Sequence, residues 1–266
     1  MQVIKYHDGQ EVELNFDKKL HAYRVDGKPV ASATKVLSVI SKPALIPWAL
    51  KQGGEFLERH LYVDEENENE KVGAFKYTSR LGLKGIVKGI KSAYRGSSGS
   101  AMETGTTAHH WIEEALLTFM SGEGSFGDDN LPDLPDDQDA CNSIEAFKSW
   151  VGDNDIDFLS SEEKIYSRQD NYAGTLDCAA YVNGSLCIID WKTSKGIYPE
   201  YHLQNAAYAQ AWEDIHGRQV EQTLVLRLDK ATGRYQQGFQ SRVEWVRNYE
   251  AFVSALNLYN RLKELK

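Results

Sequence analysis

The chain has 266 residues, 41% of them apolar, so it can form one large domain or one domain with a substantial insertion. No apolar run approaches the roughly 18 residues of a membrane-spanning helix, and the first residues lack the apolar core of a secretory signal. The three cysteines form neither a CxxC pair nor a paired framework, which is typical of reduced thiols in an intracellular protein. We therefore expect a cytoplasmic protein that makes no membrane contact.

The net charge of −9 is unevenly distributed along the chain. Residues 64–70 carry five acids and no base, and residues 121–140 carry seven acids and no base. Residues 71–95, which lie between them, carry seven Lys or Arg and no Asp or Glu. A cationic segment of this kind suits a polyanion, so the acidic total does not exclude a nucleic acid as partner.

The N-terminal third predicts short strands followed by helices. Alternating apolar and polar residues predict strands at 11–16 and 21–25, and a helical pattern begins near Ser32. A second helical stretch runs from about Pro47 to Tyr62, beyond the break at Pro43. We divide the chain into an N-terminal region at 1–100 and a core at 101–266, with one compact domain as the alternative.

A basic stripe follows the first acidic stretch. Its six members recur at spacings of four, four, four, three and four, which places them on one side of a helix: Lys76, Arg80, Lys84, Lys88, Lys91 and Arg95. Three glycines in the same segment weaken the helix prediction, and the Gly/Ser run at 96–100 predicts a flexible break. The usual explanation of a charge run is a solubilising face, but such faces mix both signs. The stripe therefore favours contact with a polyanion backbone.

The C-terminal two thirds alternate helices and strands, which predicts an α/β fold with a mixed central sheet flanked by helices. The expected helices are 104–120, 140–153, 199–216 and 243–263, and the expected strands are 159–166, 173–182, 186–192, 221–228 and 232–239. Asn183 and Gly184 form a strong hairpin signal between two of these strands.

Acidic and basic side chains meet at the end of a strand that is predicted to be buried on both faces. The apolar run at 186–189 ends in Asp190, Trp191 and Lys192. Residues two apart on a strand share a side, so Asp190 and Lys192 face the same way. Pairing through the hairpin turn brings Asp177 next to Asp190. A strand-end salt bridge explains Asp190 and Lys192 alone, but two adjacent carboxylates favour a divalent cation.

Four short motifs in order resemble the PD-(D/E)xK nuclease superfamily, and its RecB-type and mitochondrial genome maintenance exonuclease branches in particular. They are Gly-Thr-Thr-Ala-His at 105–109, Gly-Thr-Leu-Asp at 174–177, Ile-Ile-Asp-Trp-Lys-Thr-Ser-Lys at 188–195 and Gln-Asn-Ala-Ala-Tyr at 204–208. Thr and Leu replace the proline before Asp177 that gives the family its name. The resemblance implies a restriction-endonuclease-like core with a helical N-terminal region as an arch or cap.

The resemblance also implies a role for each matching residue. Asp177, Asp190, His109 and the Trp191 carbonyl would ligate Mg²⁺ or Mn²⁺. Lys192 would orient or deprotonate the attacking water and offset phosphate charge. Gln204 and Tyr208 would support the site and the DNA backbone, although an ordinary helix face is the alternative for Tyr208. Lys195 follows the strand as a candidate phosphate contact.

Two neighbouring pairs leave a choice of residue. Adjacent helical residues point about 100° apart, so only one of His109 and His110 can face the site, and the motif selects His109. Glu113 is four residues further and could orient its imidazole. Of Glu162 and Glu163, one faces solvent and the other is a candidate ligand, for which we favour Glu162.

These features together predict a Mg²⁺-dependent exonuclease that hydrolyses DNA phosphodiesters from ends. The resemblance alone implies its setting, which is phage recombination or genome processing. Its expected partners are single-stranded DNA or DNA with a free end, and a recombination or single-strand annealing protein. The same core could serve a structure- or sequence-directed endonuclease, or a catalytically inactive DNA-binding adaptor. The cysteine count and grouping predict no iron–sulfur cluster.

Overall fold

The computed structural model describes residues 2–17, 19–20, 22–40, 45–60, 62–63, 77–78, 82–122 and 131–265. These residues fall into two compact units, Met1–Ile40 with Gly105–Lys266, and Ser41–Thr104. The sequence prediction grouped residues 1–100 into one region. The first 40 residues instead belong with the core, because their last strand pairs within the central sheet. Among the described residues, no helix combines the length and apolarity needed to cross a membrane.

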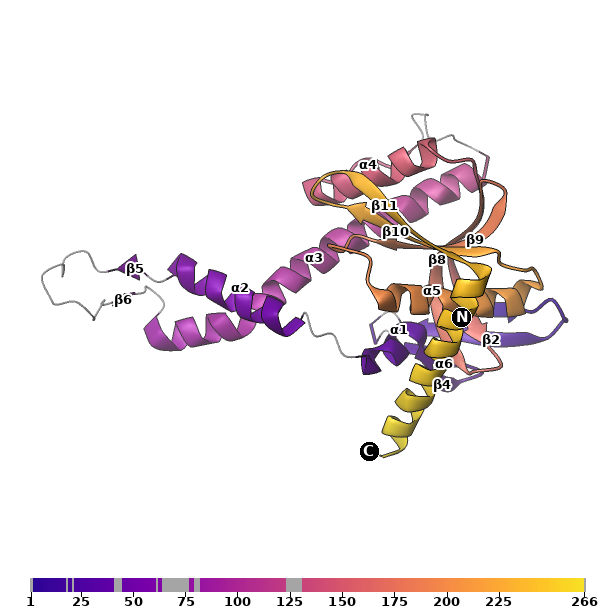
Figure 1. The fold of residues 1–266 in the computed structure, drawn as a ribbon, viewed down its shortest axis with the longest axis horizontal. Helices are drawn as coiled ribbons and strands as arrows, with labels where there is room; N and C mark the ends of the chain where they lie inside the picture. Colours follow the sequence, from indigo (N-terminus) through magenta and orange to yellow (C-terminus); the bar gives the residue numbers. More distant parts are fainter. Residues whose placement is uncertain are drawn as a thin grey trace, which may run out of the picture. The chain divides into compact units, whose positions relative to one another are not determined.

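The elements are shown in Figure 1. The strands are β1 (Gln2–Lys5), β2 (Glu11–Asp17), β3 (Ala22–Val25), β4 (Lys28–Ser32), β5 (Tyr62–Val63), β6 (Tyr77–Thr78), β7 (Ile156–Ser167), β8 (Tyr172–Val182), β9 (Ser185–Lys192), β10 (Gln222–Asp229) and β11 (Arg234–Ser241). The helices are α1 (Ala33–Val36), η1 (Leu37–Val39), α2 (Leu45–His60), α3 (Gly82–Met120), α4 (Gln138–Gly152), α5 (Pro199–His216) and α6 (Arg242–Glu264). The predicted α/β class and the mixed sheet are confirmed.

Local signals set several element ends. Asn183 and Gly184 both have positive φ, 50° and 84°, as a tight hairpin turn between β8 and β9 requires. Pro199 opens α5, and Gly217 closes it in the left-handed conformation. Ser241 starts α6 through a capping box with Glu244.

The sheet of the first unit has nine strands within the described residues, in the order β1-β2-β3-β4-β8-β9-β10-β11, with β7 paired to β8. Most pairs are antiparallel, but β9–β10 and β4–β8 are parallel. Because β7 follows one edge of β8 from end to end, β9 and β4 share the other edge. There β9 pairs with residues 178–182 and β4 with residues 172–173. The edge of β8 at 174–177 therefore lies at a fork between two partners.

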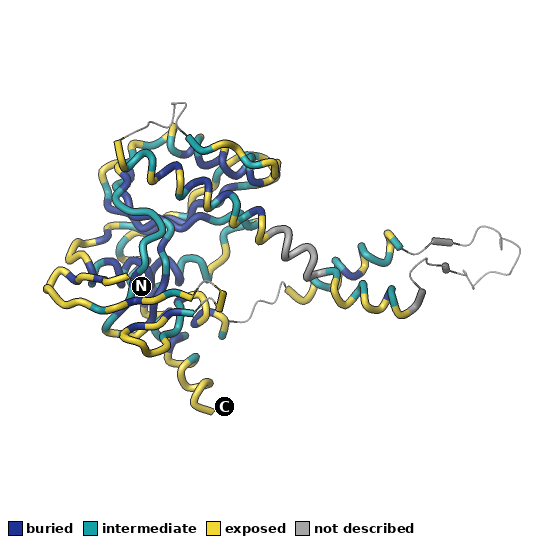
Figure 2. The backbone as a smooth tube through the Cα atoms, turned by 180° about the vertical axis from the view of Figure 1, so that it is seen from behind, coloured by how far each residue is buried: buried dark blue, intermediate teal, exposed yellow. Residues whose placement is uncertain are grey.

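Helices cover both faces of this sheet. Along β9, Leu186 and Ile188 join a core that includes residues of α5 and α6, whereas Cys187, Ile189 and Trp191 join a core with α4 and the end of α3. The alternation follows from the two-residue repeat of a strand, and it explains why this segment is apolar throughout. Figure 2 shows the buried strands between the two helical layers and the exposed C-terminal turns of α6.

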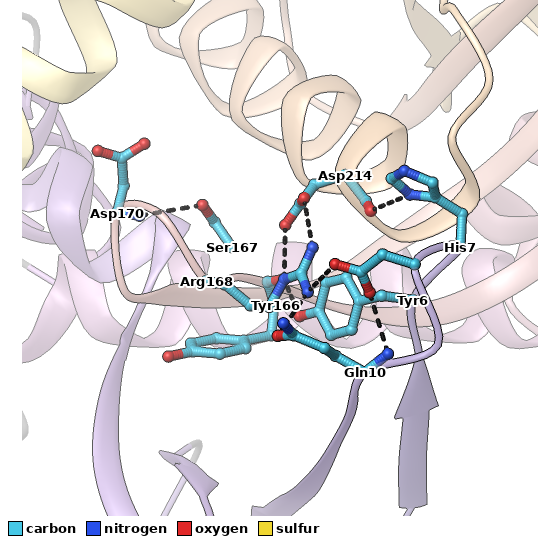
Figure 3. A network of polar contacts seen from close by, with 9 residues as sticks. Tyr6, His7, Gln10, Tyr166, Ser167, Arg168, Asp170 and Asp214 are labelled. Atoms are coloured by element: carbon cyan, nitrogen blue, oxygen red, sulfur yellow. Dashed lines mark hydrogen bonds and ion pairs between the residues drawn. The ribbon is translucent and has the colours of Figure 1, made fainter.

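A polar cluster fastens the N-terminal strands to the core (Figure 3). Arg168, just beyond β7, donates to Asp214 of α5 at 2.9 Å and to Asp8 at 2.8 Å. Its guanidinium lies 3.7 Å from the ring centroid of Tyr6, whose hydroxyl donates to the Tyr166 carbonyl at 2.7 Å. One arginine thus joins the turn after β1, the end of β7 and α5 through ion pairs and a cation–π contact.

The second unit contains α2, the β5–β6 pair and the first part of α3. A Cβ added at Gly89 would lie 1.9 Å from the Phe56 ring, so this glycine lets α2 approach α3 closely. The glycines that weakened the helix prediction therefore serve helix packing in at least this case. The predicted break at 96–100 is wrong, because α3 is helical throughout Gly82–Met120. Propagating a formed helix costs less than nucleating one, so flanking turns can carry such a run.

Candidate metal centre

The hairpin of β8 and β9 brings the two predicted aspartates to adjoining positions. The register runs from Val182↔Ser185 to Cys178↔Ile189, as the turn predicted. The next positions outward are Asp177 and Asp190, where the two strands begin to separate. The acidic side chains thus lie at the fork in the sheet rather than in the middle of a ladder.

Beyond Ile189, β9 is no longer paired with β8, and the Asp177 side chain supplies a hydrogen-bond acceptor there. Its Oδ2 atom accepts a hydrogen bond from the Trp191 backbone N–H at 2.7 Å and lies 3.8 Å from His109 Nδ1 of α3. Burial raises the pKa of the Asp177 carboxyl, while Lys192 and the Trp191 N–H partly offset that rise. Burial and the charge of Lys192 lower the pKa of His109, and the charge of Asp190 and a contact with the Trp191 backbone offset part of that fall. The backbone of Trp191 therefore lies between Asp177 and His109.

Asp190 and Lys192 lie on one face of β9, and Trp191 is packed on the other. Lys192 Nζ is 2.7 Å from Oδ2 of the fully buried Asp190. That oxygen has no hydrogen bond of regular geometry within the described residues, so the contact is an ion pair. Burial raises the pKa of Asp190 to about 6, against the opposing charge of Lys192. The pKa of Lys192 is raised because Asp190 and Asp177 outweigh burial, so the ammonium stays charged.

Gln204 and Tyr208 are brought to Asp190 from the first half of α5. Gln204 Nε2 donates to Asp190 Oδ1 at 3.2 Å and to the Tyr208 hydroxyl at 3.0 Å. Tyr208 lies against β8 because position 174 is glycine, where a Cβ would meet its ring at 2.5 Å. Residues four apart on a helix lie on the same side, so Gln204 and Tyr208 together orient the buried Asp190 carboxylate.

Three described residues offer ligand atoms that all lie within 4.8 Å of one another: His109, Glu162 and Asp177. They come from α3, β7 and β8. Asp190 is not in this group, and its carboxylate contacts Lys192 and Gln204. Burial, followed by the charge of Lys192, lowers the pKa of His109 to about 4, so its imidazole is neutral at pH 7. A neutral imidazole with two carboxylates is a donor set that divalent cations accept.

Glu162 has an unusual backbone for its position. Its φ is 49°, although it lies within β7, opposite Asp177 and between the pairs Ser161↔Cys178 and Glu163↔Leu176. A left-handed conformation costs roughly 1–3 kcal/mol for a residue with a Cβ, and such strain gathers at functional sites. Burial, then the charges of Asp177 and Glu113, raises the pKa of Glu162 to about 8. The chain thus holds an acid where its ionised form is unfavourable.

The neighbouring acid, Glu163, faces a different set of partners. Its carboxylate accepts from Ser160 Oγ at 2.6 Å and Trp212 Nε1 at 3.2 Å, and it pairs with His216 Nε2 at 2.7 Å. These hydrogen bonds keep its pKa below the usual range despite burial. Of the two glutamates, Glu162 therefore lies with the candidate metal ligands His109 and Asp177, whereas Glu163 is held by hydrogen bonds within the fold.

The neighbouring histidines, His109 and His110, also face different surroundings. His110 is exposed and lies 3.6 Å from Glu113 and 3.5 Å from Glu114, so only His109 faces the cluster. Glu113 was predicted to orient His109, but its carboxylate lies beside His110, and its charge raises the pKa of Glu162. Gly105 brings α3 against the end of β9, since a Cβ there would lie 2.9 Å from Thr193 Oγ1. Close approach at Gly105 and Gly174 gives a physical reason for the glycine in each motif.

The predicted DNA contacts are described only in part. Lys84, Lys88 and Lys91 are exposed on α3, and Lys195 is exposed after β9. Lys76 and Arg80 lie outside the described residues, as does the side chain of Arg95. The basic stripe therefore remains a prediction.

Comparison of the sequence with protein-family models and with curated proteins finds no match to either.

Proposed function

We propose that this chain is a metal-dependent deoxyribonuclease with a restriction-endonuclease-like core of the PD-(D/E)xK type. The observation that carries this proposal is the convergence of His109, Glu162 and Asp177 within 4.8 Å, beside the Lys192–Asp190 ion pair. A structural salt bridge would need the lysine and one acid. It would not need a neutral imidazole and a strained glutamate beside them.

The residues fit a hard divalent cation. Carboxylate oxygens suit Mg²⁺ or Mn²⁺, and the imidazole is available because it is neutral. Glu162 and Asp177 repel each other when ionised, which a cation between them would reverse. The motif resemblance adds Asp190 and the Trp191 carbonyl as ligands. Each carboxylate oxygen has two lone pairs, so the contacts of Asp190 with Lys192 and Gln204 leave it able to bind an ion as well. Together these donors would hold the ion at the fork.

The protein groups around the ion have distinct tasks. A bound Mg²⁺ would neutralise phosphate charge and make hydroxide available near neutral pH. Lys192 is 19% exposed, so its charged ammonium can reach a phosphate or an attacking water while Asp190 holds it in place. Gln204 fixes the second oxygen of Asp190 and keeps that carboxylate from rotating. Tyr208 in turn holds Gln204.

We further propose that the enzyme acts at DNA ends. The basic stripe and the region around it would serve as an arch or cap that admits a single strand. Phage recombination or genome processing is the expected setting, with a recombination or single-strand annealing protein as partner. An endonuclease with the same core is the second candidate, and an inactive DNA-binding adaptor is the third. The same set of candidate metal ligands supports the endonuclease, and the basic stripe supports the adaptor.

A time course with end-labelled single- and double-stranded DNA tests the proposal. Cleavage is expected with Mg²⁺ or Mn²⁺ and none with EDTA. A covalently closed circle separates the two enzyme candidates, because an exonuclease leaves it intact. Processive shortening from the ends with an intact circle supports the exonuclease, and internal cuts in the circle support the endonuclease.

The variants Asp177→Asn and Asp190→Ala should abolish cleavage, and Glu145→Gln, at an exposed position of α4, serves as the matched control. Activity that survives in both aspartate variants would belong to a contaminant and would refute the assignment. DNA binding without cleavage in any divalent metal would favour the adaptor. Circular dichroism should show that each variant keeps the wild-type fold.

A further inference from the structure

Two tyrosines lie beside the lysine of the candidate site. Lys192 Nζ is 5.1 Å from the ring centroid of Tyr201, in the first turn of α5. The Tyr198 ring meets the Tyr201 ring edge-on, with centroids 5.5 Å apart and planes at 75°. The two rings and the ammonium thus form one contiguous surface, which we name the aromatic platform (Tyr198 and Tyr201). It lies next to the groups that would hold a phosphate.

The platform is poorly explained by packing. Tyr198 is 40% exposed and Tyr201 is partly exposed, whereas α5 becomes buried from Gln204 onward. Tyr198 occupies the N-cap position of α5, yet its side chain makes no capping hydrogen bond. Fold stability gives no reason for a large aromatic at this exposed cap, where Ser, Thr, Asp or Asn is preferred. Its surroundings therefore point to a ligand.

The loop that carries the platform is fixed by its own hydrogen bonds. Arg227 Nε donates to the Ser194 carbonyl at 2.8 Å, and Ser194 Oγ donates to the Gly196 carbonyl at 2.8 Å. Arg227 is itself held by Asp229 at 2.8 Å. The rings are thus presented on a loop that is ordered before any ligand arrives, which lowers the entropic cost of binding.

We propose that the aromatic platform stacks a nucleobase of the strand whose phosphate is held at the metal centre. This inference rests on the proposed function and names its substrate class: a strand with an unstacked base, as in single-stranded DNA or a frayed end. A base lies one sugar away from its phosphate, so a phosphate beside Lys192 places a base near Tyr201 and Tyr198. Bases in an intact duplex are stacked on each other and offer the rings no free face.

Stacking on aromatic side chains is sequence-tolerant, and its loss weakens binding by roughly 5- to 150-fold per base. Lys192 would contact the phosphate and the face of Tyr201 together, which links the ring to the charge. Exposed Lys195, three residues before Tyr198, would follow the backbone of the same strand.

A binding cycle tests the platform. Dissociation constants are measured by fluorescence anisotropy for short single-stranded oligonucleotides, with Ca²⁺ in place of Mg²⁺ to suppress cleavage. One series carries a single abasic position, moved along the strand. Tyr198→Ala and Tyr201→Leu should weaken binding of the intact oligonucleotide by roughly 5- to 150-fold. They should have little further effect once the stacked base is missing, because ring loss and base loss remove the same contact.

Two further variants separate stacking from a structural role. Tyr201→Phe keeps the ring and should bind as the wild type does. Phe239→Ala is the matched control, because Phe239 is also 40% exposed but pairs with Leu224, which faces the α4 side of the sheet, away from Lys192. It should leave binding unchanged.

The outcomes distinguish the platform from the nuclease. Additive losses at every abasic position, or equal binding by Tyr198→Ala and the wild type, would overturn the platform even if cleavage is present. If the tyrosine substitutions lose their effect when the stacked base is missing, but no metal supports cleavage, the platform is supported and the nuclease is overturned. Absence of single-strand binding by the wild type would overturn the platform, and the nuclease would stand if duplex DNA is still cleaved from its ends.

Discussion

Replacing Glu162 by Gln should stabilise the metal-free protein at alkaline pH. The pKa of Glu162 is raised from 4.5 to about 8, so the folded state binds this proton more tightly than the unfolded state does. The associated stability is fully present below the unfolded pKa and is lost as pH rises through about 8. Gln has the same length and no charge, so it removes this loss while leaving the backbone strain at the position unchanged.

The magnitude follows from the two pKa values. At about 1.4 kcal/mol per pH unit, a rise from 4.5 to about 8 corresponds to on the order of 5 kcal/mol. Partial exposure of the side chain screens this, so we expect Glu162→Gln to gain about 1–3 kcal/mol near pH 9. At about pH 5 the gain should shrink, because the wild-type carboxyl is then protonated in the folded state.

The assay is urea unfolding in EDTA, followed by circular dichroism at both pH values. Glu163→Gln is the matched control, because the adjacent carboxylate is hydrogen-bonded and has a lowered pKa. It should lose about 1–3 kcal/mol at neutral pH instead of gaining stability. Equal stability of Glu162→Gln and the wild type near pH 9, or a gain that does not depend on pH, would refute the reasoning.

Three further predictions concern the metal, a glycine and the arginine cluster. Mn²⁺ affinity, measured by calorimetry, should increase from about pH 6 to pH 9, because Glu162 must lose its proton while His109 is already neutral; a flat profile contradicts this. Gly174→Ala should lower the free energy of unfolding by about 1–3 kcal/mol through its clash with the Tyr208 ring, whereas Gly152→Ala, with open space around it, should be neutral or stabilising. Arg168→Ala should lower it by about 1–2 kcal/mol and increase proteolysis within the N-terminal strands, and unchanged cleavage there would argue against the fastening role.

Most elements of the first unit could be predicted from the sequence because their signals are local. The hairpin turn at Asn183 and Gly184 fixed the register of β8 and β9, and with it the adjoining positions of Asp177 and Asp190. The two-residue repeat of a strand placed Lys192 beside Asp190. These relationships span few residues and depend on backbone geometry alone.

The remaining features depend on contacts between distant segments. The pairing of β4 with β8 has no local signal, so the N-terminal strands were assigned to a separate region. The left-handed backbone of Glu162 arises inside β7, just after a register shift between Phe158 and Ser160, and has no local sequence signal. Asp190 could be named from its motif, but only the packed structure shows that Lys192 and Gln204 occupy its oxygens. The tyrosines at 198 and 201 were missed because an aromatic at a helix start gives no pattern of its own.

The parallel pairing of β4 with β8 has a consequence for synthesis on the ribosome. Ala31 pairs with Tyr172, so about 140 residues must follow it before its partner exists. At about 5–20 residues per second, this takes roughly 7–30 seconds, during which the β4 edge of the β1–β4 meander stays unpaired. Such an edge is a site for wrong pairing between nascent chains. Yield in the cell should therefore depend on chaperone capacity and translation speed, even for variants whose purified stability is normal.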